Sequence, residues 1–296
     1  MRKLIISFCL VIPQVIFSQT LKEVHLLPYI AYINFENAFQ KEYTGVFGIY
    51  GYYGVGLKHS FEAGADFTQI NFGTRDLEVS EEVIRFNEFK INQLDLTAVY
   101  NNFQLLNLQL RAGIHTIITD DSLTNNAIIV FGGVKRYRSN IYNAGIDIYG
   151  SFYNNYAPNL KAVQITATFG FNFGNYYQSG SFYAETRGHY INLSEEAGFG
   201  ETQFPSIEQS LFYYYKKFTM EAFFWIGYQL FAVQNNGFVV YNLAERHLGA
   251  YGGTIKFGLS NKASIKIKIS RARFKELGLD EIVKSTSVVL ITGFSL

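Results

Sequence analysis

From about His25 to Leu296 the chain repeats one pattern, in which apolar side chains alternate with polar ones or with glycine over about ten to fifteen residues at a time. The segment from Phe61 to Thr68 is an example, with aromatic or small apolar residues at its odd positions. Successive side chains of a β-strand point to opposite faces. Each segment therefore predicts a strand with one apolar and one polar face.

Fourteen such segments follow one another, at 25–35, 44–54, 57–73, 86–100, 104–118, 126–138, 141–154, 160–174, 179–193, 205–216, 218–232, 248–260, 263–275 and 285–296. Tight connections are predicted at Val55-Gly56, Asn101 to Phe103, Ser139-Asn140, Asn175 to Gln178, Lys216-Lys217 and Asn261-Lys262. Longer polar connections alternate with them, at 74–85, 119–125, 194–204, 233–247 and 276–284.

An even number of strands joined alternately by short turns and long loops is typical of a barrel that spans a membrane. We therefore predict an all-β fold, an antiparallel up-and-down transmembrane β-barrel with fourteen strands. Twelve strands are the alternative, if the weakly patterned first strand pairs loosely or the region 233–260 is misassigned.

The amino terminus differs from this pattern. Two basic residues precede an apolar run that ends at Phe17, and the small residue Ser18 follows. This arrangement predicts a signal peptide over 1–19, cleaved near Ser18 or Gln19. The run is short for a membrane-spanning helix and contains a proline. The remaining residues, 20–296, are predicted to form a single barrel domain.

Composition narrows the class of protein further. The 25 basic and 24 acidic residues leave no basic excess for nucleic acid. Aromatic residues make up 17% of the chain and gather near the segment ends, where rings favour the headgroup level of a membrane. The single cysteine, Cys9, lies in the predicted signal peptide, so the mature chain has no thiol. This suits an oxidising envelope compartment.

The last segment carries a resemblance. Its alternate residues Val288, Leu290, Thr292, Phe294 and Leu296 share one face, as in the C-terminal strand of bacterial outer-membrane barrels, which the barrel-assembly machinery recognises. That pattern favours a terminal aromatic residue, whereas this chain ends in leucine. In strand number, turns and size the mature chain resembles the small monomeric fourteen-stranded porins, at the level of class. The resemblance implies a Gram-negative-type outer membrane, with its lipid, lipopolysaccharide and assembly machinery as partners.

If the apolar faces contact lipid, the alternate residues face the lumen, because a charge on the lipid face at mid-membrane costs about 2–4 kcal/mol. We predict that the pore is lined by Glu62, Asp66, Asp95, Gln109, Arg111, His115, Asp147, Glu185, Arg187, His189, Glu208, Glu221, Lys256, Lys266 and Lys268.

The two signs of charge are partly segregated in this set. Acids prevail on the strands near 57–100, and the lysines gather near 248–275. One hypothesis is a transverse electric field across the pore. The alternative is local pairing, for which the candidate pairs are Asp95 with Arg111 and Glu185 with Arg187.

Strand number predicts the width of the lumen. Side chains fill a barrel of about eight strands, and sixteen to eighteen strands leave an aqueous channel. Fourteen strands predict a narrow channel unless a loop folds inward. We therefore predict a porin-like channel for passive diffusion of small polar solutes or ions. A structural or secretion-accessory barrel is an alternative. A hydrophobic-substrate transporter is less favoured, because only about five residues precede the first strand, too few for the long N-terminal plug of that class.

A lipid hydrolase is a further alternative. The residues Gly56-Leu57-Lys58-His59-Ser60 resemble the start of the motif of outer-membrane phospholipases, in which a serine lies two positions after the histidine. Here Ser60 directly follows His59, so the two side chains point to opposite faces and cannot form a nucleophile–base pair. We therefore expect no enzyme activity. The five histidines show no metal-ligand spacing, and we predict no metal or cofactor.

Overall fold

The computed structural model describes residues 22–296 except 57, 80–81, 106–107 and 139–140. The predicted signal peptide and its cleavage site lie outside the described residues. Within them, no helix is long and apolar enough to cross a membrane.

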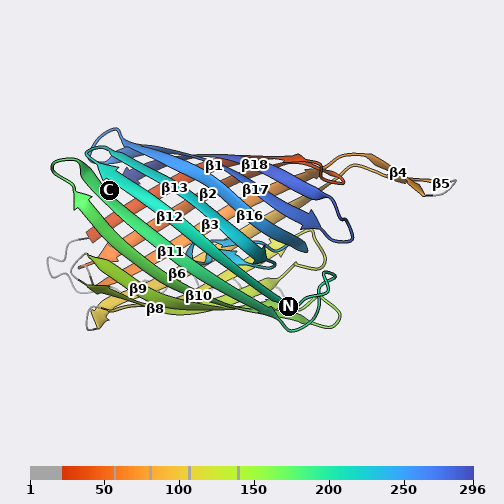
Figure 1. Ribbon diagram of the computed structural model, residues 1–296, viewed down its shortest axis with the longest axis horizontal. Coiled ribbons are helices and arrows are strands. Elements are labelled where there is room, and N and C mark those ends of the chain that lie inside the picture. Colours follow the sequence, from red (N-terminus) through yellow and green to blue (C-terminus); the bar gives the residue numbers. More distant parts are fainter. Residues whose placement is uncertain (1–21, 57, 80–81, 106–107, 139–140) are drawn as a thin grey trace, which may run out of the picture.

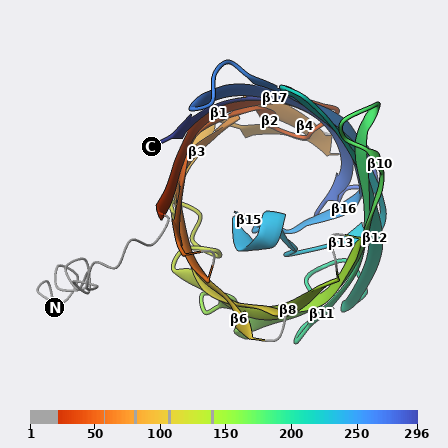
Figure 2. The same cartoon turned by 90° about the vertical axis from the view of Figure 1, so that its left-hand side faces the viewer.

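Fourteen long antiparallel strands form one closed barrel (Figures 1 and 2), which confirms the predicted fold class and excludes the twelve-stranded alternative. These strands are β1 (Lys22–Glu36), β2 (Lys41–Val55), β3 (His59–Phe72), β6 (Phe89–Leu105), β7 (Leu108–Thr119), β8 (Ala127–Arg138), β9 (Tyr142–Tyr153), β10 (Leu160–Asn175), β11 (Gly180–Leu193), β12 (Gln203–Tyr215), β13 (Phe218–Gln229), β16 (Glu245–Gly258), β17 (Ala263–Glu276) and β18 (Ile282–Ser295). Each of these fourteen strands pairs with the next barrel strand along the chain, and the first pairs with the last.

The pairing of β1 with β18 closes the ring. Its register runs from His25 opposite Ser295 to Glu36 opposite Lys284. A closed barrel has no open edge, so every strand has a backbone partner on each side. Because each strand reverses direction, β1 begins and β18 ends at one end of the barrel, together with the tight turns. We call this the short-turn end and the opposite one the long-loop end.

One predicted turn is wrong. Asn101 to Phe103 was expected to form a tight turn, but β6 continues to Leu105. Asn101 pairs with Ser60 of β3 and with Arg111 of β7, and its buried amide donates a hydrogen bond to the Ser60 hydroxyl at 3.1 Å. Asparagine favours turns through its local side-chain bonds. Here its side chain bonds across the wall instead.

Two short hairpin sheets are not part of the ring. Strands β4 (Arg75–Val79) and β5 (Glu82–Phe86) form a hairpin that projects beyond the long-loop end (Figure 1). Strands β14 (Val233–Gln234) and β15 (Val239–Val240) lie in the connection between β13 and β16. The expected strand 218–232 therefore ends at Gln229, and the following residues leave the wall.

The two faces of the wall differ in chemistry. Large apolar side chains are exposed on the outer face, for example Phe47, Ile148 and Ile267. Polar side chains such as Gln164 and Thr166 are buried on the inner face. Water would not stabilise an apolar outer band of this extent, whereas the hydrocarbon of a bilayer would. The barrel is therefore a transmembrane one.

We predict that Ile148→Arg, near the middle of the outer face of β9, destabilises the barrel by about 2–4 kcal/mol. The exposed Ile141, next to the short-turn end of the same strand, is the matched control. Because the cost of a charge falls toward the interface, Ile141→Arg is expected to cost only about 0–1 kcal/mol. Urea unfolding in phospholipid vesicles measures both values, and equal costs would contradict the assignment of the outer face to lipid.

Candidate pore and its constriction

The connection between β13 and β16, residues 230–244, folds into the barrel, and we call it the inner loop. It contains β14, the short 3-10 helix η1 (Asn235–Gly237) and β15. Figure 2 shows it in the middle of the ring of strands. In the strand order β6 and β7 lie about half-way around the ring from β13 and β16. The contacts of the inner loop with β6 and β7 therefore mean that it crosses the lumen.

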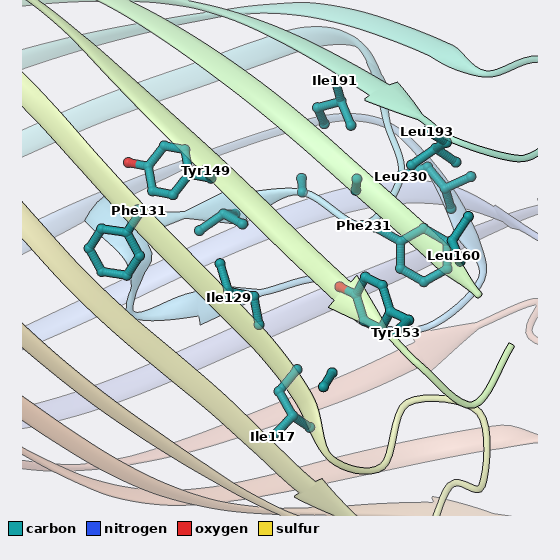
Figure 3. Close-up of a cluster of buried hydrophobic side chains, with 14 of the residues drawn as sticks. Ile117, Ile129, Phe131, Tyr149, Tyr153, Leu160, Ile191, Leu193, Leu230 and Phe231 are labelled. Carbon is teal, nitrogen blue, oxygen red and sulfur yellow. The ribbon is translucent and has the colours of Figure 1, made fainter.

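The first part of the inner loop is an apolar anchor. Leu230, Phe231 and Ala232 are fully buried, and Phe231 packs on Tyr153 with ring centroids 4.8 Å apart. The surrounding side chains point inward from the wall (Figure 3), among them Ile117, Ile129, Leu160 and Ile191. Phe204 belongs to the same cluster. Fully burying a leucine or phenylalanine side chain contributes about 1.5–3 kcal/mol. This cluster fixes the inner loop near the long-loop end.

Gln164 of β10 holds the backbone of the loop just after this anchor. Its amide oxygen accepts a hydrogen bond from the Val233 N–H at 2.8 Å, and its amide nitrogen donates one to the Val233 carbonyl at 2.7 Å. Gln164 and Val233 are both about 2% exposed, so water cannot replace these bonds. A buried backbone group without a partner costs about 1–3 kcal/mol. One side chain therefore satisfies both polar groups of this residue.

The tip of the inner loop is held by the opposite wall. The Gly237 carbonyl lies 3.1 Å from Nδ1 of His115 on β7, and Arg111 donates a hydrogen bond to the Asn236 carbonyl. Phe238 packs edge-to-face on Tyr50 of β2, with centroids 5.1 Å apart. Each contact joins the loop to a strand far from β13 in the ring.

The backbone of the tip explains its sequence. Asn235, Asn236 and Gly237 have φ values of 47°, 58° and 92°, in the left-handed region. Asparagine and glycine adopt this region most readily. A β-carbon at Gly237 would also overlap the ring of Phe131. Conformation and space both require glycine at this position.

The last part of the inner loop returns along the wall. The Asn242 amide donates a hydrogen bond to Gln93 of β6 at 2.7 Å, and Gln93 in turn donates one to Asp95 at 2.7 Å. Tyr241 stacks on His247, and burial raises the pKa of the Tyr241 phenol to about 12. The inner loop is thus held at its base, its tip and its return.

The structure places the predicted lining residues on the inward-facing positions of their strands. Whether they line a conducting pore stays a prediction. Three carboxylates lie on β3 and β6. Glu62 accepts hydrogen bonds from Tyr50 at 2.7 Å and Asn101 at 2.6 Å, Asp66 accepts one from Tyr29, and Asp95 lies 3.0 Å from Nε2 of His115. Gln109 joins Asn101 to Tyr137. These side chains are tied to their neighbours.

A second group combines both signs of charge. Glu185 pairs with Arg187 at 2.6 Å and with Lys135 of β8 at 3.2 Å, and Arg187 also lies 3.9 Å from Glu208. His189 lies 3.8 Å from Glu208. The predicted local pair of Glu185 with Arg187 is therefore confirmed. Arg111, with Asp147 at 3.5 Å, forms a neighbouring pair beside the tip of the inner loop.

The predicted pair of Asp95 with Arg111 is wrong. Asp95 lies opposite Ile117, whereas Arg111 lies opposite Asn101, so the two are six positions apart in the register of β6 and β7. Asp95 pairs with His115 instead, and Arg111 with Asp147. Pairing in a sheet follows register, which the alternation of side chains does not specify.

A third group lies on β13, β16 and β17. Glu221 accepts a hydrogen bond from Thr254 at 2.9 Å. Lys256, Lys266 and Lys268 lie together on the adjacent strands β16 and β17, where Lys256 is directly opposite Lys266. The three lysines differ from the cations on β7, β8 and β11, each of which is paired with a carboxylate.

Sequence reasoning missed the inner loop. It placed a long polar loop at 233–247, without an inward course. Two local signals were present, the apolar run from Leu230 to Val233 and the Asn235-Asn236-Gly237 turn sequence. Leu230 to Ala232 were assigned to the predicted strand 218–232, so the run was not recognised as the start of a segment that leaves the wall.

His59 and Ser60 do not form a catalytic pair. Ser60 is buried on the inner face, where Asn101 donates a hydrogen bond to it, while His59 bonds to the Tyr100 hydroxyl at 2.7 Å on the other face. In the part of the chain that the structure describes, no cluster of three or more His, Cys, Asp or Glu side chains is placed to hold a metal ion.

Comparison with known proteins gives structural relatives. No protein-family model matches the sequence, and no curated protein matches it. The crystal structure of the Ralstonia pickettii toluene transporter TbuX superposes with a TM-score of 0.55 at 10% identity, over 93% of this chain and 88% of that one. The Acinetobacter baumannii outer membrane protein Omp33 gives 0.50 at 9% identity, over 93% and 99%. The chain has the fold of outer-membrane β-barrel proteins. At these identities the likeness concerns the fold alone.

We predict that Gln164→Leu loosens the inner loop while the barrel stays closed. The substitution leaves the N–H and carbonyl of Val233 buried without partners, at about 1–3 kcal/mol each, so amide exchange across 233–238 should accelerate at least about tenfold. Hydrogen exchange followed by mass spectrometry measures this.

The control is Gln69→Leu, which removes a hydrogen bond to Asn92 at 3.0 Å, away from the inner loop. Exchange in the inner loop should then stay at the wild-type rate. Unchanged exchange in Gln164→Leu would show that this side chain does not hold the loop.

Proposed function

We propose that this protein acts in a Gram-negative-type outer membrane as a narrow, non-enzymatic channel for the passive diffusion of small polar solutes or ions. The observation that carries the proposal is the inner loop, which is fastened across a polar lumen and narrows it. The wall formed by β16, β17, β18 and β1 keeps half-buried or exposed inward side chains, among them Lys256, Ser270 and Ser287. Accessible side chains inside a closed wall favour a water path beside the loop.

The proposal includes the route to the membrane. Cleavage near Ser18 or Gln19 would release the mature chain, and the barrel-assembly machinery would recognise β18. In support, Val288, Leu290 and Phe294 are exposed on the outer face of β18, where a recognising partner or lipid can reach them. Lipid and lipopolysaccharide would then contact the outer band.

We predict small ohmic openings when the refolded protein is inserted into a planar bilayer. Replacing residues 233–241 by a short Gly-Ser linker keeps the apolar anchor Leu230 to Ala232 but removes the part that crosses the lumen. Because a fourteen-stranded barrel is wide enough for water once it is unfilled, conductance should rise at least about twofold.

The matched control shortens the β4–β5 hairpin, residues 75–86, which lies outside the ring. Its conductance should equal that of the wild type. Heat-modifiable migration on gels checks that each variant is folded. A folded wild type that stays silent, together with a silent linker variant, would overturn the channel and favour the structural or secretion-accessory barrel.

A further inference from the structure

Three lysines form a cluster on the inner wall toward the short-turn ends of β16 and β17. Lys256 lies directly opposite Lys266, and Lys268 lies opposite Thr254. Like charges directly opposite each other in a sheet are destabilising. The repulsion within the cluster therefore lowers the stability of the folded barrel unless an anion offsets it.

The cluster has no partner of opposite sign in contact. Among the residues described, no carboxylate oxygen lies within 4.0 Å of these three ammonium groups. The neighbouring acid is Glu221, which already accepts the Thr254 hydroxyl. Lys268 instead lies over the ring of Phe223, 4.6 Å from its centroid. Other inward-facing cations such as Arg111, Lys135 and Arg187 are each paired with a carboxylate.

An apolar strip begins directly beside the lysines. Lys266 lies opposite Ile291 and Lys268 opposite Val289 of β18. The same row continues from Val289 to Ala31 of β1 and from Ala31 to Val46 of β2. These apolar side chains are half-buried on the inner face. Lysine ammonium groups and hydrocarbon thus lie next to each other on one stretch of wall.

This strip is unusual for its position. Inner faces of such barrels are polar, because they contact water. Within the described residues, the apolar cluster around the inner loop does not include the strip residues Ile291, Val289, Ala31 and Val46. Their hydrocarbon is therefore left facing the lumen. A solute with an apolar part would gain by covering it.

We propose that this wall binds an amphipathic organic anion, with the anionic head on Lys266 and Lys268 and the hydrocarbon body on the strip of β18, β1 and β2. Ammonium groups bind oxyanions through charge-assisted hydrogen bonds, and the strip covers the apolar part. The inference rests on the proposed function, because a solute on this wall lies on the diffusion path. It specifies the class of solute that the channel favours.

The test uses hexane-1-sulfonate and methanesulfonate, whose heads stay charged and which differ in hydrocarbon length. Binding of each radiolabelled sulfonate to protein in nanodiscs is measured against empty nanodiscs. Because burial of each added methylene group is favourable, hexane-1-sulfonate should bind at least about tenfold more tightly.

Two variants separate the head from the body. K266Q/K268Q should weaken both sulfonates, whereas V289T/I291T should weaken hexane-1-sulfonate and leave methanesulfonate unchanged. K262Q, in the turn between β16 and β17, is the matched control and should bind like the wild type.

The outcomes distinguish the two proposals. Equal binding of both sulfonates by the wild type, or unchanged binding in K266Q/K268Q, overturns this inference. The planar-bilayer recording is made on the same preparations. A barrel that conducts but fails these binding tests keeps the proposed channel and loses the amphipathic-anion site. A barrel that binds as expected but never conducts keeps the site and loses the channel.

Discussion

Backbone pairing between β1 and β18 is the constraint on which the rest of the structure depends. Lipid offers no hydrogen bonds, so each N–H and carbonyl in a spanning strand needs a partner in the neighbouring strand. Closing the ring satisfies the first and last strands together, from His25 opposite Ser295 to Glu36 opposite Lys284. Once the ring is closed, alternation sorts every side chain into an outer face toward lipid or an inner face toward the lumen.

The inner loop meets the same constraint by other means. A loop inside a barrel carries backbone polar groups that water reaches poorly, so side chains of the wall must bond to them. Gln164 satisfies Val233, His115 faces the Gly237 carbonyl, and Arg111 bonds to Asn236. These polar residues of the inner wall therefore have a structural role as well as a place in the lumen. The constriction and its support form one unit.

The predictable features are the ones that local sequence encodes. Strand number and the two faces follow from a period of two residues, and the pair of Glu185 with Arg187 was found because both lie on one strand, two positions apart. The turn at Asn101 was wrong because its side chain bonds across the wall to Ser60. The pair of Asp95 with Arg111 was wrong because register sets partners between strands. The inward course of the inner loop depends on contacts with strands half a ring away.

The inner wall consequently has two regions, which differ in whether their charged side chains are paired. On β6 to β12 the charges are paired with one another or with the inner loop, as Asp95 is with His115 and Glu185 with Arg187, and a paired charge has little field left to act on a solute. On β16 and β17 no carboxylate oxygen of the described residues lies within 4.0 Å of Lys256, Lys266 or Lys268, and beside them the wall is apolar. The polar side chains that bond to the loop, such as Gln164 and Arg111, differ from the lysines that a passing solute would contact. Substituting the lysines therefore leaves these hydrogen bonds of the loop in place.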